Sequence, residues 1–417
     1  MEILSVYLYK LPVGELHREE TKLSFRYFDS YLQLSKAVPL SRHLPLTTPG
    51  SSKTYYDADT RAFFENLLPE AGVRERVARS LGLSPENIFG LLQAIGGDCA
   101  GAVSVIAQNE EIKPSGGYKK IARAELVDQL ARLPAHPFLA GDEGVRLSLA
   151  GAQNKLPIYY QDDELAIPLG SAASSHILKT QIPGLENTVI NEAFCMDLAS
   201  RVGLPAPAVT VVEAGEIQVY MVERFDRLRT ENSGMLRLHQ EDFCQALGVP
   251  PALKYEKEGG PGFSDCFSLV RSWSSEPLLD VALLLRWALF NFLIGNADAH
   301  AKNISFLYVD GTVRLTPFYD LISTAVYGRQ IDNKFAMKMG GQKDPRYLSA
   351  GHLQKFAQEV RVGGRAVTSE LQKLTVKMEK GIVQLVEEYR SRYDSPVIVG
   401  RLQDVVGQRL TKAKFLL

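Results

Sequence analysis

The sequence predicts an α+β protein with two lobes, a β-rich N-terminal half joined to an α-rich C-terminal half with a cleft between them. Short runs of β-branched and aromatic residues, bounded by turn residues, recur through the first 225 residues. Helical patterns dominate from about residue 226 onward. A chain of 417 residues is long enough for two or three lobes with a sizeable core.

The first predicted region, residues 1–135, is mixed and contains much strand. We expect strands at residues 3–11 and 23–31, and helices at residues 59–68, 69–81 and 86–93. Pro69 ends one helix and begins the next, and Gly82 closes the second. Ser84 is the expected N-cap of the third helix.

The second region, residues 136–226, reads as strands around one helix. The expected strands are residues 155–160, 164–167, 175–180, 208–212 and 217–225, and the expected helix is residues 187–202. Gly203 and Pro205 close the helix. Ala214 and Gly215 form the turn of a hairpin between the last two strands.

The third region, residues 227–417, is mostly helical. Residues 278–294 are apolar almost all round, which predicts a buried central helix. Asp280, Arg286 and Asn291 interrupt this stretch, so a transmembrane helix is not expected. Residues 370–393 form an amphipathic helix.

Composition points to a soluble cytoplasmic protein in a reducing compartment. The formal net charge is −1, so overall charge predicts neither nucleic-acid nor membrane binding. The cysteines lack the spacing of a zinc site or a disulfide framework. The chain starts without the basic segment and apolar run of a signal peptide.

The strongest chemical signal is the pair Asp298 and Asn303, which has the spacing of a kinase catalytic loop. In that loop the carboxylate accepts or orients the proton of the attacking hydroxyl, and the amide oxygen helps to hold magnesium. The pair follows the expected central helix directly, which gives it a rigid support.

A predicted hairpin supports this interpretation. Residues 304–309 and 312–318 are the strands, and Asp310-Gly311 is the turn signal. The hairpin returns the chain toward Asn303, so Asp320 becomes the second magnesium ligand. Two other interpretations stay open: a polar loop that caps two helices, and a transition-metal site at Asp298, His300 and Asp320.

Two further parts are needed for a nucleotide. Residues 148–155 are rich in small residues and precede a strand, so their backbone N–H groups can reach phosphate oxygens, although the segment also fits an ordinary tight turn. Lys179 lies on a short strand, and Glu192 on the following helix is its candidate partner. Residues 222–226 end the last strand before the helical half, where a kinase hinge presents its backbone to adenine.

At these residues the chain resembles the HipA family of bacterial serine/threonine kinases. The matching segments are residues 148–155, 222–227, 294–303 and 316–320, with weaker likeness at 22–27, 97–103, 239–242 and 336–341. The Asp-x-His-x-x-Asn pattern also resembles kinases of the phosphatidylinositol 3-kinase type. The resemblance implies a two-lobed kinase-like fold with Asp298 as the catalytic base.

The resemblance also implies ATP and Mg²⁺ as cofactors, with Asn303 and Asp320 holding the metal. The residues implied to contact ATP are Ala150, Gly151, Ala152, Gln153, Asn154, Lys155, Lys179, Glu223, Arg224, Phe225, His300, Ala301, Lys302, Asn303, Tyr319 and Asp320. Ser148 matches an inhibitory autophosphorylation site whose modification expels the phosphate loop. The implied function is a bacterial toxin that phosphorylates an aminoacyl-tRNA synthetase, the glutamyl enzyme being favoured, and halts translation. The implied partner is a HipB-like DNA-binding antitoxin, and this antitoxin is expected to make most of the contacts with DNA.

The chain departs from ordinary protein kinases before the base, where Asn296-Ala297 replaces His-Arg, and after the metal aspartate, where Leu321-Ile322 replaces Phe-Gly. Both departures are expected of the HipA family. Asn154 stands where a family member has an acidic residue. Two other functions remain open, a small-molecule kinase and a non-catalytic partner of a DNA-binding repressor.

Overall fold

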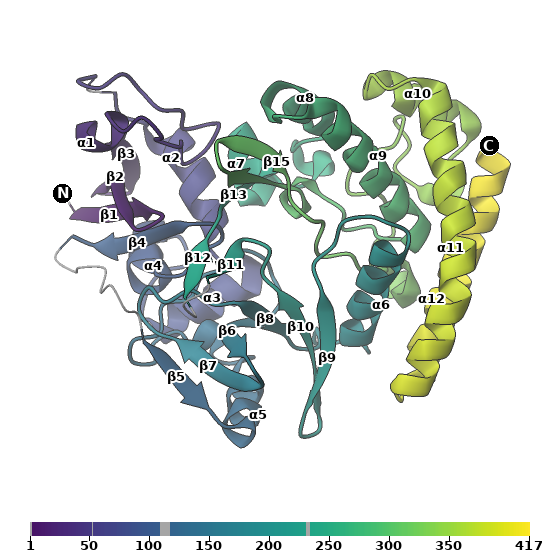
Figure 1. Ribbon diagram of the computed structural model, residues 1–417, viewed down its shortest axis with the longest axis horizontal. Coiled ribbons are helices and arrows are strands. Elements are labelled where there is room, and N and C mark those ends of the chain that lie inside the picture. Colours follow the sequence, from purple (N-terminus) through teal and green to yellow (C-terminus); the bar gives the residue numbers. More distant parts are fainter. Residues whose placement is uncertain (1, 52, 109–116, 231–233) are drawn as a thin grey trace. The chain divides into compact units, whose positions relative to one another are not determined.

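The computed structural model describes residues 2–51, 53–108, 117–230 and 234–417 (Figure 1). The chain forms two compact units, each assembled from separate segments. The first unit contains residues 1–180, 212–252 and 305–312, and the second contains residues 181–211, 253–304 and 313–417.

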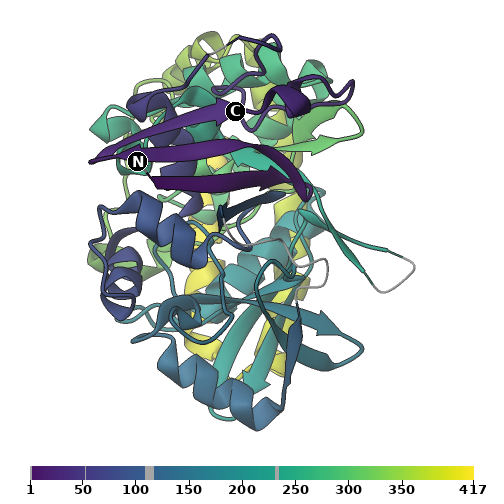
Figure 2. The ribbon, with the colours of Figure 1, turned by 90° about the vertical axis from the view of Figure 1, so that its left-hand side faces the viewer.

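The first unit begins with an antiparallel sheet of strand order β3-β2-β1-β4 (Figure 2). Its strands are β1 (Glu2–Leu8), β2 (Leu11–Glu19), β3 (Lys22–Tyr27) and β4 (Val103–Ala107). The helices around it are α1 (Asp29–Leu32), α2 (Asp57–Phe64), α3 (Ala71–Ser80) and α4 (Ile88–Ile95). Buried aromatic side chains, among them Phe25, Phe63 and Phe64, fill the core between sheet and helices.

A second sheet in the first unit carries the segments predicted to bind nucleotide. Its order is β5-β7-β6-β8-β10-β9. The strands are β5 (Tyr118–Ile121), β6 (Lys155–Gln161), β7 (Glu164–Pro168), β8 (His176–Lys179), β9 (Val209–Ala214) and β10 (Ile217–Glu223), with helix α5 (Arg123–Arg132) before β6. Gly215, with φ +60°, makes the β9–β10 turn, as predicted.

Shorter strands complete the first unit. The strand β11 (Arg227–Arg229) pairs with β12 (Met235–Arg237), and β13 (His239–Asp242) pairs with β14 (Ser305–Val309). Helix α7 (Phe243–Leu247) follows β13. Asp310 and Gly311 join β14 to β15 (Thr312–Leu315), and both have positive φ, as a two-residue hairpin turn requires.

The second unit is helical. Its long helices are α6 (Thr188–Arg201), α8 (Phe263–Trp273), α9 (Pro277–Ile294), α10 (Ala350–Glu359), α11 (Gly364–Arg392) and α12 (Pro396–Leu416). Figure 1 shows α11 and α12 side by side at the C-terminal end of the chain. Leu371, Leu374 and Met378 of α11, and Leu402 and Val406 of α12, are buried.

Helix α9 is the predicted central helix. By length and composition it is long and apolar enough to cross a membrane, but 61% of that stretch is buried inside the protein. Asp280 in its first turn is fully buried and forms an ion pair with Arg314 at 3.0 Å. These features belong to a core helix with a polar anchor at its start.

The α+β class and most element positions are confirmed, and four local predictions are wrong. The strand expected through residue 11 ends at Leu8, and the next strand begins at Leu11 after a turn at Tyr9 and Lys10, both with positive φ. The N-cap of α4 is Asn87, which accepts from the N–H of Gly90 at 3.0 Å. Ser84 lies one turn too early and hydrogen-bonds residue 86 instead.

The other two differences have simple causes. The strand expected through residue 31 gives way to α1, because the chain turns at Phe28 and Tyr31 enters a helical turn. The strand expected through residue 318 stops at Leu315, because Pro317 has no N–H to donate to a sheet.

Candidate active site

In the first unit, residues 148–155 form a loop whose backbone is packed against residues 67–76. The Oγ of Ser148 donates to the carbonyl of Leu67 at 2.8 Å, and the carbonyl of Gly151 accepts from the N–H of Glu70 at 3.1 Å. Gly151 has φ +112°, and a Cβ there would lie 2.6 Å from the Nζ of Lys155. Glycine is therefore required at this position for the loop to close.

Other residues of this loop are also held by hydrogen bonds. The Nζ of Lys155 donates to the carbonyl of Ala150. Gln153 donates to the carbonyl of Thr180 at 2.8 Å, and Asn154 accepts from Arg76 at 3.0 Å. Ala152 is exposed at the tip of the loop. The structure thus describes the loop in a folded-in conformation, with Ser148 fully buried.

Two buried lysines lie opposite each other on neighbouring strands. Lys155 on β6 pairs in register with Lys179 on β8, and their exposed fractions are 7% and 6%. Residues directly opposite on antiparallel strands share one face of the sheet, and like charges there repel. Two positively charged lysine side chains on one face of the sheet suit a phosphate-binding role. Glu192, the candidate partner of Lys179, belongs to the second unit.

The predicted hinge, residues 223–225, alternates between outward and inward side chains. Glu223 is exposed, and Phe225 is half-buried. The side chain of Arg224 points inward and binds Asp226 through two hydrogen bonds of 2.9 and 2.7 Å, while its N–H donates to the carbonyl of Ser175. The side chain of Arg224 is therefore engaged in holding the hinge, which leaves backbone atoms for nucleotide binding.

Arg224 belongs to a cluster of five buried charges: Asp98, Arg224, Asp226, Arg227 and Arg237. Asp98 contacts Arg227 at 2.8 Å, Arg237 at 2.9 Å and Arg224 at 3.4 Å. Burial alone would raise the pKa of Asp98, but the three guanidinium groups and the Ser174 hydroxyl together hold this pKa well below its ordinary value. The pKa of Asp226 is lowered against burial in the same way, by Arg224 and Arg227.

In the second unit, the predicted catalytic loop follows α9 directly. Gly295 ends the helix with φ +71°, and a Cβ there would lie 2.7 Å from the Cβ of Ala325, so only glycine fits. The side chain of Asn296 donates to Asn291 at 2.8 Å and accepts from the N–H of Asp298 at 2.9 Å. Asn296, which stands where ordinary kinases have the histidine of His-Arg-Asp, therefore links the base to the rigid helix.

The predicted base and metal ligand are joined through the loop backbone. The side-chain amide of Asn303 donates to the carbonyl of Asp298 at 3.0 Å, which leaves the amide oxygen of Asn303 for another ligand. The hydroxyl of Tyr319 donates to the carbonyl of Lys302 at 2.9 Å and thereby ties the segment of Asp320 to this loop. Asp320 has φ +54°, a conformation that costs free energy in a non-glycine residue.

The remaining predicted residues of this loop are buried. Ala301 and Lys302 lie in the short 3₁₀ turn Ala301–Asn303, and the Nε2 of His300 lies 3.9 Å from the Oδ1 of Asp298. In the described part of the chain, no group of three His, Cys, Asp or Glu residues is arranged to hold a metal ion. The geometry gives no support to the transition-metal alternative, whereas the amide of Asn303 and the carboxylate of Asp320 are the hard oxygen donors that magnesium prefers.

A cavity of about 510 Å³ opens onto Asp298. The lining residues come from the second unit alone and include Tyr255, Lys257, Asp298, Tyr327, Lys334 and Lys343. Asn303 and Asp320 do not line it. Burial raises the pKa of Tyr327 to about 12, so its phenol stays protonated near neutral pH and is not suited to act as a base.

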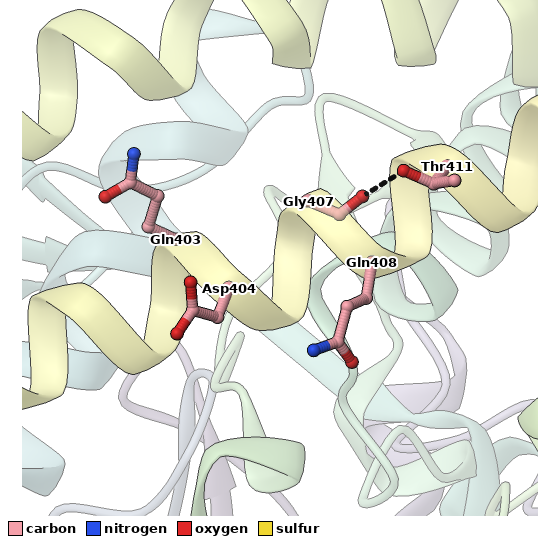
Figure 3. Close-up of a pocket in the computed structure, with 5 residues that line it drawn as sticks. All are labelled: Gln403, Asp404, Gly407, Gln408 and Thr411. Carbon is pink, nitrogen blue, oxygen red and sulfur yellow. Dashed lines mark hydrogen bonds between the residues drawn. The ribbon is translucent and has the colours of Figure 1, made fainter.

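A second hollow, on α12, has no comparable chemistry. Its lining residues Gln403, Asp404, Gly407, Gln408 and Thr411 all lie on one exposed face of the helix (Figure 3). The only hydrogen bond between them joins the Thr411 hydroxyl to the Gly407 carbonyl at 2.9 Å, a local helix contact. A lone carboxylate on a solvent-facing helix surface is not an active site.

Two residues of the site carry no signal that the sequence analysis used. Asn296 was read only as a departure from the kinase pattern, although it positions Asp298. Tyr255 lies 43 residues before Asp298, and its hydroxyl donates to the Oδ1 of Asp298 at 2.5 Å. No spacing rule connects two residues so far apart, and only the folded chain brings them together.

Comparisons with known proteins give similar family models and relatives over most of the chain. The family described as HipA-like C-terminal domain matches residues 147–385, and the family described as HipA N-terminal domain matches residues 4–106. "Putative kinase Y4mE" of Sinorhizobium fredii is 39% identical over 415 residues, which cover 98% of each chain. "Serine/threonine-protein kinase toxin HipA" of Shewanella oneidensis is 32% identical over 395 residues, 92% of this chain and 89% of that protein.

A solved structure is also similar over the whole chain. It is the complex of HipA, HipB and operator DNA from the Shewanella oneidensis toxin–antitoxin system. The match has a TM-score of 0.86 and 30% sequence identity, and covers 99% of this chain and 98% of that chain.

Proposed function

Because the chain belongs to the HipA family of serine/threonine kinases, we propose that it transfers the γ-phosphoryl group of ATP to a serine or threonine of a protein. The observation that carries the proposal is the position of Asp298, a carboxylate on an ordered loop that opens onto a cavity large enough for an acceptor side chain. The cavity excludes the two expected metal ligands, so it suits the acceptor better than the nucleotide.

The chemistry follows from these positions. Asp298 takes the proton of the acceptor hydroxyl as the hydroxyl oxygen forms a bond to the γ-phosphorus. The bond from that phosphorus to the β–γ bridging oxygen breaks, and ADP leaves with the electron pair. Asn303 and Asp320 hold the magnesium ion, which neutralises charge on the phosphate oxygens when it is bound.

The first unit supplies the groups for the nucleotide. The backbone of residues 150–155 and the ammonium groups of Lys155 and Lys179 bind phosphate oxygens, and the backbone of residues 223–225 binds adenine. The second unit contributes residues 300–303, Tyr319 and Asp320. The placement of the two lysines opposite each other on one face of the sheet supports this assignment.

The test is calorimetric titration of the folded protein with a non-hydrolysable ATP analogue and magnesium. We expect saturable binding that weakens roughly ten- to hundred-fold in Lys179→Met, the size expected for a lost charge-assisted contact. Asp320→Asn is expected to weaken binding only when magnesium is present. Lys120→Met serves as the matched control, since Lys120 is an exposed lysine paired with Glu164 at the surface. Absence of saturable heat from folded wild-type protein contradicts the proposal.

We further propose that the kinase phosphorylates its own Ser148 and is thereby inactivated. Ser148 is fully buried, with its Oγ on the carbonyl of Leu67 and its N–H on the carbonyl of Asp98 at 3.1 Å. A phosphoryl group adds about two negative charges and three strong acceptors, which a closed and buried site cannot solvate. A phosphorylated loop must therefore stay outward, where its N–H groups no longer face the ATP phosphates.

Incubation with ATP and magnesium is expected to produce a phosphopeptide that contains Ser148, and the separated phosphorylated form is expected to bind the ATP analogue poorly. Ser148→Ala should stay unmodified and keep its affinity. Ser148→Asp should lose affinity, while Ser84→Asp, at an exposed serine of the same unit, should not. The switch is refuted if active protein stays unmodified at Ser148, or if the phosphorylated form binds ATP as well as before.

The proposal extends to the biological role. A relative is named as a HipA kinase toxin, and the similar solved complex contains HipB and operator DNA. We propose that this chain is likewise a bacterial cytoplasmic toxin and that a HipB-like antitoxin neutralises it. The antitoxin would make most of the contacts with DNA. Its target is proposed to be an aminoacyl-tRNA synthetase, with the glutamyl enzyme favoured.

A further inference from the structure

The hydroxyl of Tyr255 donates a hydrogen bond of 2.5 Å to the Oδ1 of Asp298. The tyrosine ring also meets the ring of His300 edge to face, with centroids 5.0 Å apart. Tyr255 lines the same cavity as Asp298. A half-buried phenol therefore contacts the group that takes the proton in the proposed reaction.

The backbone around Tyr255 is held firmly. The carbonyl of Tyr255 accepts from the N–H groups of Glu258 and Gly260, each at 3.0 Å. A Cβ at Gly260 would lie 1.7 Å from the carbonyl oxygen of Leu253, so the turn tolerates only glycine there. This turn fixes the direction in which the tyrosine ring leaves the chain.

The next residue adds a second anchor. The N–H of Glu256 donates to the carbonyl of Ala336 at 3.3 Å, and its carboxylate accepts from the N–H of Lys338 at 2.6 Å. The Nζ of Lys338 also forms an ion pair with Glu256 at 3.2 Å. The segment that carries Tyr255 is thus bound to Ala336 and Lys338, which also line the cavity, and the position of the phenol is fixed by the fold of the second unit.

The two oxygens of Asp298 have different surroundings. Oδ1 receives the Tyr255 hydroxyl, whereas the structure gives Oδ2 no hydrogen-bond partner among the residues that it describes. The side chain of Asp298 is 51% exposed, so without the phenol it would be free to rotate. A carboxylate held by one oxygen presents the other in a fixed direction.

We propose that Tyr255 is a positioning residue: its hydroxyl holds Oδ1 of Asp298 and thereby aims Oδ2 at the acceptor hydroxyl. The inference rests on the proposed kinase function and adds a residue that no catalytic-loop pattern contains. His300, two positions after the base, lies beside the tyrosine ring. Tyr255 supplies the hydrogen-bond donor from a different segment.

The test compares Tyr255→Phe with wild type in transfer of labelled γ-phosphate from ATP and magnesium to a degenerate mixture of serine and threonine peptides. Phenylalanine keeps the ring against His300 and removes the hydroxyl alone. We expect kcat to fall roughly ten- to hundred-fold, the size expected for a lost hydrogen bond to a charged group. The affinity for the ATP analogue should stay unchanged.

The split between kcat and KM separates positioning from a merely structural role. A residue that only supports the cavity wall should change KM for the peptide and the midpoint of thermal unfolding together with kcat, whereas Tyr255→Phe should lower kcat and leave both other values at those of wild type. Tyr347→Phe is the matched control, since Tyr347 is 67% exposed in the same unit. It should change none of the three values.

Three outcomes overturn the inference. If Tyr255→Phe keeps wild-type kcat, or lowers kcat only together with a change in KM and in the unfolding midpoint, the contact does not position the base. If Tyr255→Phe is faster than wild type, the hydroxyl blocks the acceptor rather than aiming the base. If folded wild-type protein binds ATP but neither phosphorylates the peptides nor hydrolyses ATP, the kinase proposal fails. The proposed role of Tyr255 then fails as well.

Discussion

Replacing Asp298 by asparagine is expected to slow phosphoryl transfer by about 10²–10⁴-fold while leaving the fold intact. Asparagine keeps the volume of the side chain and an oxygen that can accept from the Tyr255 hydroxyl, so the hydrogen bond of 2.5 Å has a counterpart in the variant. The variant loses the negative charge and the basicity that take the acceptor proton. Affinity for ATP and magnesium should change little, because Asn303 and Asp320 remain.

The measurement is single-turnover transfer from labelled ATP, with thermal unfolding to establish that the variant is folded. Asp404→Asn is a suitable control, because Asp404 lies on the exposed face of α12 in the same unit and takes part in no catalytic contact (Figure 3). An Asp298→Asn protein with the rate of wild type would show that another group is the base.

Replacing Asp98 by asparagine is expected to destabilise the first unit by about 3–5 kcal/mol, the usual cost of removing one partner from a buried ion pair. Asp98 is fully buried and meets three arginines, and Ser174 donates to it at 2.7 Å. With asparagine at this position, Asp226 is the one carboxylate left in the cluster. Its single negative charge cannot balance the positive charges of Arg227 and Arg237. Urea unfolding followed by fluorescence gives the change in free energy.

The loss of stability caused by Asp98→Asn should depend on pH, and the sign of that dependence follows from the lowered pKa of Asp98. A carboxyl with a depressed pKa in the folded protein contributes stability above its unfolded pKa of about 4. That contribution disappears as pH falls through the folded value. The difference in stability between wild type and Asp98→Asn should therefore be constant near neutral pH and shrink below about pH 4.

Asp142→Asn is the control for this experiment. Asp142 meets Arg132 at 3.4 Å in a partly exposed ion pair, and such surface pairs contribute about 0–1 kcal/mol. If Asp98→Asn unfolds at the same urea concentration as Asp142→Asn, the cluster of five buried charges does not stabilise the first unit.

Much of the fold could be predicted because its signals are local. The apolar run of α9, the glycine after it and the Asp310-Gly311 turn each fix an element within a few residues. The spacing of Asp298 and Asn303 predicts a loop that the structure shows linked by the hydrogen bond from Asn303 to the Asp298 carbonyl. The approach of Asp320 to the loop followed from the hairpin length, and the Tyr319 hydrogen bond to Lys302 supports it.

The rest depends on contacts that sequence spacing does not reveal. The sequence indicated a hinge at residues 222–226 but not that the side chain of Arg224 is held by aspartates at positions 98 and 226, one of them more than a hundred residues away. The N-cap of α4 is Asn87 and not Ser84, because the Oγ of Ser84 accepts from the N–H of residue 86 in a local turn. Strand β2 escaped prediction because Pro12 and Gly14 are usually turn residues, although a bulge in β2 itself, at Val13 between them, accommodates both.

The central claim, transfer of phosphate from ATP to a protein hydroxyl, is tested most directly by mass spectrometry of a bacterial protein extract incubated with the purified chain, ATP and magnesium. We predict new phosphoserine or phosphothreonine on a small set of proteins, produced by wild type and absent with Asp298→Asn. An extract in which wild type consumes ATP and phosphorylates only a small metabolite, with no protein modified beyond the Asp298→Asn sample, would contradict the account.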